Sequence, residues 1–287
     1  MGQSKLSRID VFVTVITLII ISFMMTSFLG CVVVYSPKLK CYNNLKGVGT
    51  ALAAYAYYNN DEFPVAGGDG PWSQKLGWDY DDPKASFDPG DKYEHAPRTL
   101  TASWYILTRE MDLDPSALVC PAVIGATRFN GDGSSTELID MWDFGDTPYE
   151  HVSYSIQNQY GKYPAHKTSP ADNAIAADMS PWFDANGDIL PPATGTDSPQ
   201  LIDPSDLDTW QLGNSRNHNG KGQNVLFNDM HVSFEKTPTV GVDQDNIYTY
   251  WTNPDNPTPA DKQQGQNPTA RDKANDSQAP EDSFLAI

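Results

Sequence analysis

The chain has 287 residues, with 19 Lys or Arg against 37 Asp or Glu, which gives a formal net charge of −18 at pH 7. Such an acidic surface repels phosphate backbones, so the composition excludes nucleic acid as a partner. The length is sufficient for one or two domains with a sizeable core.

The first predicted element is an apolar helix near the N-terminus. No charged residue occurs from Val11 to Val34, and about 20 apolar residues in a helix are enough to cross a bilayer. Lys5 and Arg8 precede this run, and the positive-inside rule then places the N-terminus in the cytoplasm. We therefore expect a cytoplasmic N-terminus at residues 1–8, a single-pass transmembrane helix in the inner membrane at residues 9–35, and export of the rest.

Three interpretations of this N-terminal segment compete. A cleaved secretory signal has a shorter apolar core and a small-residue cleavage site, neither of which occurs here. A lipoprotein signal would place a lipid on Cys31, although the apolar run continues beyond that cysteine. We favour a retained helix, because residues 38–58 continue a helical pattern of apolar residues. Pro37 should kink the resulting helix of about 50 residues. The alternative is two separate helices, a membrane anchor and a core helix, joined at Pro37.

The rest of the chain predicts one more helix and several short strands. Residues 99–111 read as an amphipathic helix, because their apolar residues recur on one face. Short apolar segments predict strands, and the last two of them form a tight hairpin across an Asn-Asp-Met turn. The predicted strands are residues 151–156, 174–178, 223–227 and 231–236.

These elements predict an α+β fold. We expect residues 36–252 to form an exported domain in which the long N-terminal helix packs on an antiparallel sheet with long loop insertions. Residues 253–287 contain many prolines and polar residues and few apolar side chains. Such a segment cannot bury enough area to offset its ordering entropy, so we predict a disordered tail.

Two cysteines lie in the predicted domain. A disulfide between Cys41 and Cys120 is possible in an oxidising compartment. Two reduced, buried thiols are an equally acceptable interpretation, because the sequence does not place the two Cα atoms within bonding reach.

Three motifs in the chain match a known family. Residues 41–46 read C-Y-N-N-L-K and precede a small-residue helix and a Phe-Pro pair; residues 177–184 read A-D-M-S-P-W-F-D; residues 217–232 contain N-H-N-G, then Q-N-V-L-F, then Asp and His. With the apolar N-terminal helix, this combination resembles the type IV pilin-like proteins, in particular the pseudopilin-like family related to the major type II secretion pseudopilin.

The resemblance implies a non-enzymatic subunit of a type II secretion or type IV pilus-related assembly. Its partners would be further copies, bound through the N-terminal helix, together with other pseudopilins or secretion components and the membrane. Ten residues separate the signature histidine from the signature aspartate, where the family has nine, and Met230 stands where the family has Gly. The signature positions are Asp10, Cys41, Asn43, Asn44, His218, Asn224 and Asp229.

A calcium site is the one metal site that the sequence suggests. Asp184, Asn186 and Asp188 place oxygen ligands at alternate positions around Gly187, and calcium prefers six to eight oxygens in a flexible loop. Major type II pseudopilins bind calcium in a late loop, and Asp178 would be a further ligand here. The alternative interpretation is a turn rich in Asp and Asn, since the full EF-hand pattern is absent.

Catalytic motifs are lacking. The chain contains no H-E-x-x-H or C-x-x-C zinc pattern and no G-x-S-x-G nucleophile elbow. His218 and Asp229 could pair near the hairpin, and we assign them a structural role rather than acid–base work. We therefore predict that the chain is not an enzyme. The alternative function is a membrane-anchored, exported binding protein, for calcium or polysaccharide, that does not polymerise.

Overall fold

The structure, a computed structural model, contains two units, Met1–Ser36 and Pro37–Ile287, which are described separately. In the first unit the structure describes only the backbone of residues 10 and 23–29 and not their side chains. The described residues are 7–29, 36–66, 99–131, 133, 137–145, 147–192, 199–271 and 275–287.

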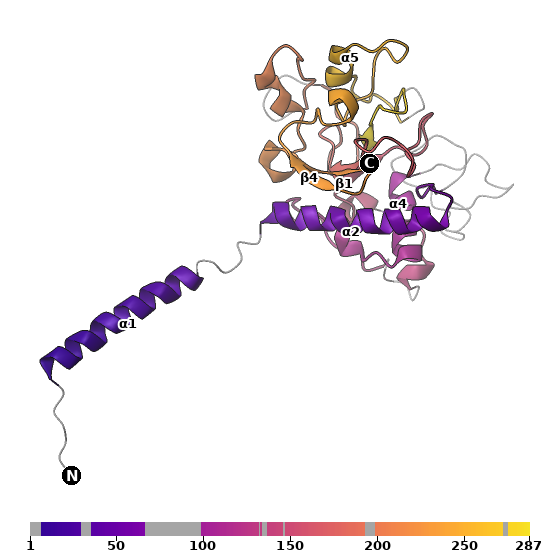
Figure 1. Cartoon of the computed structure of the whole chain (residues 1–287). Coiled ribbons are helices and arrows are strands. Elements are labelled where there is room, and N and C mark those ends of the chain that lie inside the picture. Colours follow the sequence, from indigo (N-terminus) through magenta and orange to yellow (C-terminus); the bar gives the residue numbers. More distant parts are fainter. Residues whose placement is uncertain are drawn as a thin grey trace. The chain divides into compact units, whose positions relative to one another are not determined.

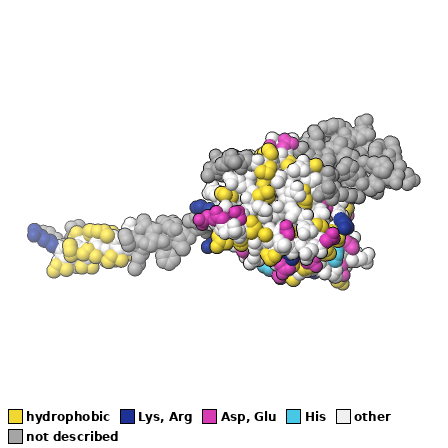
Figure 2. Space-filling view, turned by 90° about the horizontal axis from the view of Figure 1, so that it is seen from above, with side chains coloured by type: hydrophobic (Ala, Val, Ile, Leu, Met, Phe, Trp, Pro, Cys, Tyr) yellow, Lys and Arg dark blue, Asp and Glu magenta, His cyan; other side chains and the backbone are white. Residues whose placement is uncertain are grey.

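The first unit contains helix α1, Arg8–Leu29. Its described apolar side chains are exposed, from 40% for Ile16 to 72% for Ile9 (Figure 2). None of the helices in the described part of the chain combines the length with the hydropathy that crossing a bilayer requires. This finding contradicts the predicted transmembrane helix at residues 9–35, and with it the single-pass placement in the inner membrane and the export of the remainder.

The predicted long, continuous N-terminal helix is also wrong. Helix α1 ends at Leu29, and helix α2, Pro37–Tyr58, begins the second unit. Proline suits the first position of a helix, where its missing N–H leaves no bond unmade, but it disrupts a helix interior. The second unit does combine helices with an antiparallel sheet, so only the α2 half of the expected helix belongs to this domain.

Helix α2 packs with one face on the sheet and on helix α4, Leu100–Met111 (Figure 1). Its buried face includes Cys41, Leu45 and Val48, which recur at helical spacing. A Cβ atom at Gly49 would lie 2.8 Å from the side chain of Leu226 in the sheet. Glycine at this position therefore lets the helix backbone approach the sheet closely.

The sheet has five antiparallel strands in the order β4-β3-β2-β1-β5. The predicted strands at 174–178 and 223–227 are confirmed without change of bounds, and the strand expected at 151–156 begins three residues later. The predicted helix 99–111 is confirmed as α4. The strands are β1 Tyr154–Gln157, β2 Ala174–Asp178, β3 Gln223–Phe227, β4 Val232–Glu235 and β5 Leu285–Ala286.

The predicted hairpin joins β3 to β4. The amide of Phe227 donates to His231 O at 3.0 Å, and the amide of Met230 donates to Phe227 O at 2.8 Å. Met230 has a φ of +69°, a left-handed conformation that glycine adopts without steric cost. The hairpin therefore needs a left-handed residue at the position where the family that the sequence resembles has glycine.

The remaining helices of the described residues are short. They connect the strands and carry several of the polar side chains described below. They are η2 Pro115–Leu118, η3 Leu138–Asp140, η4 Pro148–Glu150, η5 Leu207–Gly213, η6 Asn217–Gly220, η7 Val242–Gln244 and α5 Pro259–Gln264.

The prediction of a disordered tail at residues 253–287 is wrong. Strand β5 pairs with β1 at the edge of the sheet, and the C-terminus lies beside β1 (Figure 1). Phe284 and Leu285 are fully buried. The segment is polar on average, but residues 284–287 form a compact apolar group. Buried hydrogen bonds satisfy some of the segment's polar groups, such as the bond from Gln157 Nε2 to Ser277 Oγ at 2.7 Å.

Three buried carboxylates hold this C-terminal segment. Asp245 accepts hydrogen bonds from Trp251 Nε1 at 2.7 Å and from the Ser283 amide at 2.8 Å. Burial raises the pKa of Asp245 to about 8 and that of Asp276 to about 7. Burial, together with the charge of Asp245, also raises the pKa of Asp282.

We expect the free energy of unfolding to fall as the pH rises from about 4 to about 8. In this window the folded state holds protons that the unfolded chain has already released, so raising the pH favours unfolding. The loss should be on the order of a few kcal/mol, since one pKa unit corresponds to about 1.4 kcal/mol. Urea unfolding at several pH values measures it.

The variant Asp245→Asn should lessen this pH dependence, whatever its absolute stability, because an amide does not titrate while Asp276 and Asp282 remain. Asp208→Asn is the matched control, since Asp208 is exposed on η5. A stability that is constant or rises across the window would contradict the protonation of these buried groups.

Candidate functional site

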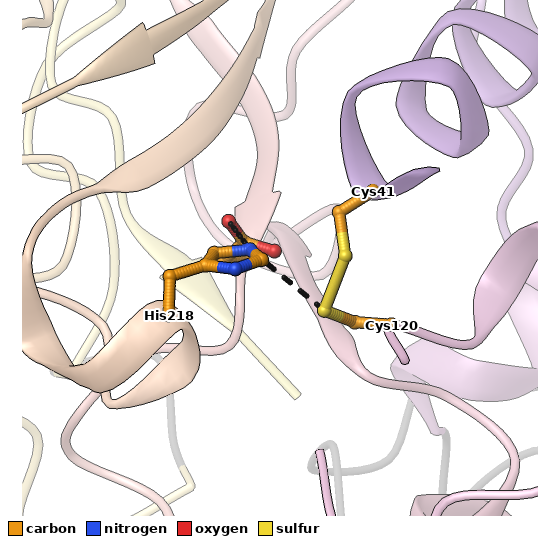
Figure 3. A group of neighbouring side chains, drawn as sticks. Cys41, Cys120 and His218 are labelled. Carbon is orange, nitrogen blue, oxygen red and sulfur yellow. Dashed lines mark hydrogen bonds and ion pairs between the residues drawn. A yellow bond between two sulfur atoms is a disulfide. The ribbon is translucent and has the colours of Figure 1, made fainter. Parts of the chain in front are cut away.

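Cys41 and Cys120 form a disulfide at the interface of α2 and the segment after η2 (Figure 3). Their Cα atoms are 5.3 Å apart, within the usual range of about 4.4–6.8 Å. Both residues are fully buried. Of the two interpretations left open by the sequence, the structure has the disulfide rather than two thiols.

Asp178 ends strand β2 beside this disulfide and is fully buried. The β2–β3 pairing aligns Ala177 with Val225 and so brings Asp178 next to Asn224. Asn224 donates to Asp178 Oδ2 from its amide nitrogen at 2.7 Å and from Nδ2 at 3.0 Å. Within the described residues, Asp178 Oδ1 has no hydrogen-bond partner. One carboxylate oxygen is thus fixed, and the other is buried and unsatisfied.

His218 completes the cluster from η6. Its Nε2 lies 3.1 Å from Asp178 Oδ2 and 3.8 Å from Cys120 Sγ (Figure 3). The side chain is only 7% exposed. His218 and Asn219 have φ values of +55° and +60°, and such left-handed backbone costs free energy in residues other than glycine. The local fold therefore holds a strained turn that aims this imidazole into the core.

Polar side chains from α2, from strand β1 and from the segment after η7 lie around the cluster. Asn44 Nδ2 donates to Val119 O at 2.8 Å and to Tyr154 Oη at 3.1 Å, and Tyr248 Oη donates to Asp178 O at 2.7 Å. Burial, and secondarily the charge of Asp178, raises the pKa of both tyrosines. Both phenols therefore stay protonated and available as donors.

Four of the signature residues thus meet in one place with Asp178. The sequence resemblance named Cys41, Asn44, His218 and Asn224 but gave no reason for their proximity. What sequence reasoning missed was the role of Asp178 as the partner of His218. The only feature of the sequence that pointed to this role is the position of Asp178, which is the acidic residue at the end of the strand next to the predicted hairpin.

The other signature residues lie elsewhere. Asn43 is exposed on α2. Asp229 sits in the hairpin turn, where it accepts from the amide of His231 at 2.9 Å and contacts the His231 ring. The suggested pairing of His218 with Asp229 does not form, because Asp229 follows the far end of β3 whereas His218 lies near its start. The side chain of Asp10 lies outside the described residues.

The predicted calcium ligands are not brought together. Asp184 Oδ1 accepts from the amides of Asn186 and Asp188, each at 2.8 Å, and Gly187 has a φ of +75°. This is the turn rich in Asp and Asn that the alternative interpretation described. Asp178 does not join it, because its carboxylate faces His218 and Asn224.

Arg271 also lies against the loop 184–188. Its guanidinium donates to Gly187 O, and its Cζ atom lies over the Phe183 ring, 5.3 Å from the ring centroid. A fixed positive charge at this place disfavours a bound cation. The one group of His, Cys, Asp or Glu ligand atoms that gather closely in the described part of the chain is Cys41, Cys120, Asp178 and His218.

The cluster does not have the geometry of a Cys-His-Asp catalytic triad. In a triad the nucleophile and the carboxylate contact opposite nitrogens of the imidazole. Here Cys120 Sγ and Asp178 Oδ2 both face Nε2 of His218, and the sulfur is bonded to Cys41. The arrangement is suited to holding α2, η6 and the sheet together.

Comparison of the chain with family models, with curated proteins and with solved structures finds no match. Membership of the pilin-like family, which the motifs suggest, therefore stays a prediction.

Proposed function

We propose that the chain is a non-enzymatic, pilin-like subunit that assembles with further copies of itself through helix α1. The observation that carries this proposal is the exposure of the described apolar side chains of α1. Ten of them, between Ile9 and Ile21, are 40–72% exposed. They include neighbouring positions throughout residues 9–21, so the helix is apolar on every face.

A helix of this kind needs a partner. Apolar area in contact with water is unfavourable by roughly 25 cal/mol per Å², and a helix that is hydrophobic all round is normally buried. A second copy of α1 supplies a matching surface, since neither helix carries a charge from Val11 to Ser22. The remainder of the chain after residue 34 has 17 basic and 36 acidic residues, a net charge of −19. Mutual repulsion opposes contact between these acidic parts, which leaves the uncharged stretch of α1 as the surface better suited to self-association.

The second unit is suited to a structural role. Its cluster of chemically versatile side chains is closed: Asp178 is fully buried, His218 is almost so, and the two sulfurs are bonded to each other. A substrate would have no direct access to these groups. This burial supports a non-enzymatic subunit over an enzyme.

Sedimentation velocity and negative-stain electron microscopy of the full-length chain test the proposal. We expect large assemblies for the parent. Charges placed on one helix face, in Ile16→Lys/Ile20→Lys, or on another, in Leu18→Lys/Ile21→Lys, should dissociate them, because a buried unpaired charge is costly in a helix interface.

Ile124→Lys is the matched control, since Ile124 is fully exposed in the second unit. It should assemble like the parent. A parent chain that is monomeric, or assemblies that survive both double substitutions, would contradict assembly through α1. A monomer would favour the alternative function of a binding protein that does not polymerise.

A further inference from the structure

We propose that reduction of the Cys41–Cys120 disulfide converts the buried cluster into a four-ligand site for Zn²⁺, formed by the two thiolates, His218 and Asp178. The inference is independent of assembly through α1. In the oxidised chain the buried cluster holds the domain together, and in the reduced chain the same residues would bind a metal ion.

The distances already approach those of such a site. The four ligand atoms all lie within 4.8 Å of one another. In a tetrahedral site with Zn–S bonds of about 2.3 Å and Zn–N or Zn–O bonds of about 2.0 Å, neighbouring ligand atoms are roughly 3.3–3.8 Å apart. The separations of His218 Nε2 from Asp178 Oδ2, 3.1 Å, and from Cys120 Sγ, 3.8 Å, are close to these values. The main change required is the parting of the two sulfurs.

A second observation points to a missing ligand. Asp178 is fully buried, and its Oδ1 has no hydrogen-bond partner among the described residues. An unsatisfied buried carboxylate oxygen is costly, and a metal ion bound by Oδ2 would place a compensating positive charge next to it. The two hydrogen bonds from Asn224 meanwhile hold the carboxylate in one orientation, as the outer partners of metal ligands commonly do.

The imidazole of His218 also points toward the other proposed ligands. Nε2 of His218 faces both Asp178 Oδ2 and Cys120 Sγ (Figure 3), so a single nitrogen points to the centre of the four ligands. Thiolate and imidazole ligands together are preferred by Zn²⁺. A bound dication would also offset the three negative charges of two thiolates and one carboxylate in a buried place.

A dithiol or a phosphine can reduce the Cys41–Cys120 disulfide. Reduction adds two electrons and two protons to the disulfide and yields two thiols, while the reductant is oxidised. Zn²⁺ then binds and displaces the two thiol protons to solvent, without any change in its own oxidation state. A disulfide oxidant reverses the change: it takes two electrons from the two zinc-bound thiolates and is itself reduced to two thiolates, which take up protons from solvent. Formation of the Cys41–Cys120 bond then removes two ligands and releases the metal.

Metal content of the full-length chain tests the proposal. The chain is incubated with Zn²⁺ either oxidised or with a phosphine reductant, and bound zinc is measured after gel filtration. We expect one zinc per chain in the reduced state and none in the oxidised state. Co²⁺ in place of Zn²⁺ should give the intense visible absorption of a tetrahedral site with sulfur ligands. Equal metal content in both states would overturn the proposal.

Substitutions separate the four-ligand site from binding by two thiols alone. His218→Ala and Asp178→Asn should each weaken zinc binding to the reduced chain by at least about 100-fold, since even outer partners of a metal ligand are worth 10–100-fold. His231→Ala and Cys31→Ser are the controls, because His231 is exposed in the hairpin and Cys31 is not one of the four proposed ligands. Zinc binding that is unaffected by His218→Ala and Asp178→Asn would refute the assignment.

Near-UV circular dichroism shows whether the reduced chain keeps its fold. If it unfolds without metal, added Zn²⁺ should restore the native spectrum, because binding free energy then becomes folding free energy. A reduced chain that unfolds and is not restored by Zn²⁺ would also count against the site.

Discussion

Deletion of residues 284–287 is expected to prevent the chain from folding. Phe284 and Leu285 are 0% exposed and Ile287 is 2% exposed. Loss of one such side chain typically costs about 2–5 kcal/mol, so losing all three approaches the whole stability of an ordinary domain, about 5–15 kcal/mol. The deletion also leaves Gln157 Oε1 without the Phe284 amide that donates to it at 2.8 Å.

Near-UV circular dichroism and limited proteolysis measure this result. The milder variant Phe284→Ala should still fold and lose about 3–5 kcal/mol in urea unfolding. Ile124→Ala is the control, since Ile124 is fully exposed and its truncation should leave stability within about 0.5 kcal/mol. A truncated chain with native spectra and native protease resistance would show that the last strand is dispensable.

Replacement of the disulfide by Cys41→Ser/Cys120→Ser should have the next largest effect. The two cysteines are 79 residues apart in the sequence, and the loop-closure entropy of such a cross-link corresponds to about 4.5 kcal/mol. Urea unfolding of the double variant and of the oxidised parent, both with a chelator present, measures the difference.

The parent treated with a reductant and a chelator should lose a similar amount of stability. Cys31→Ser should match the oxidised parent, because this cysteine is outside the disulfide. A loss below about 1 kcal/mol in the double variant would mean that the bond does not restrain the unfolded chain as the entropy model requires.

Local patterns predicted the regular elements of the second unit well. The helix at 99–111 and the strands at 174–178 and 223–227 follow from the spacing and type of neighbouring residues, and the structure places them with little change. The hairpin at 228–230 was predictable for the same reason. Each of these elements depends on interactions within a few residues, which a sequence pattern records directly.

The candidate site was only half predictable. The motif resemblance singled out Cys41, His218 and Asn224. The sequence also suggested that His218 could pair with Asp229, which follows the far end of β3. The actual partner, Asp178, is on the neighbouring strand. Which strand lies beside which, and in what register, decides this contact, and no local pattern records it.

The prediction for residues 253–287 was wrong because it relied on the average composition of the segment. The many Pro, Asn and Asp residues there suggested disorder, whereas the short apolar end docks as β5 against β1. Docking depends on a vacant sheet edge and on buried partners such as Gln157, which come from more than a hundred residues earlier in the chain.

By itself the sequence determined the acidic charge, the apolar character of α1 and the identity of most helices and strands. These are properties of single residues and of their near neighbours. The tertiary structure alone decided that Cys41 reaches Cys120, that His218 meets Asp178, and that the C-terminal residues belong to the core. The physical reason is that burial and hydrogen bonding between distant segments depend on how the whole sheet and α2 pack, and many different packings are compatible with the same local pattern.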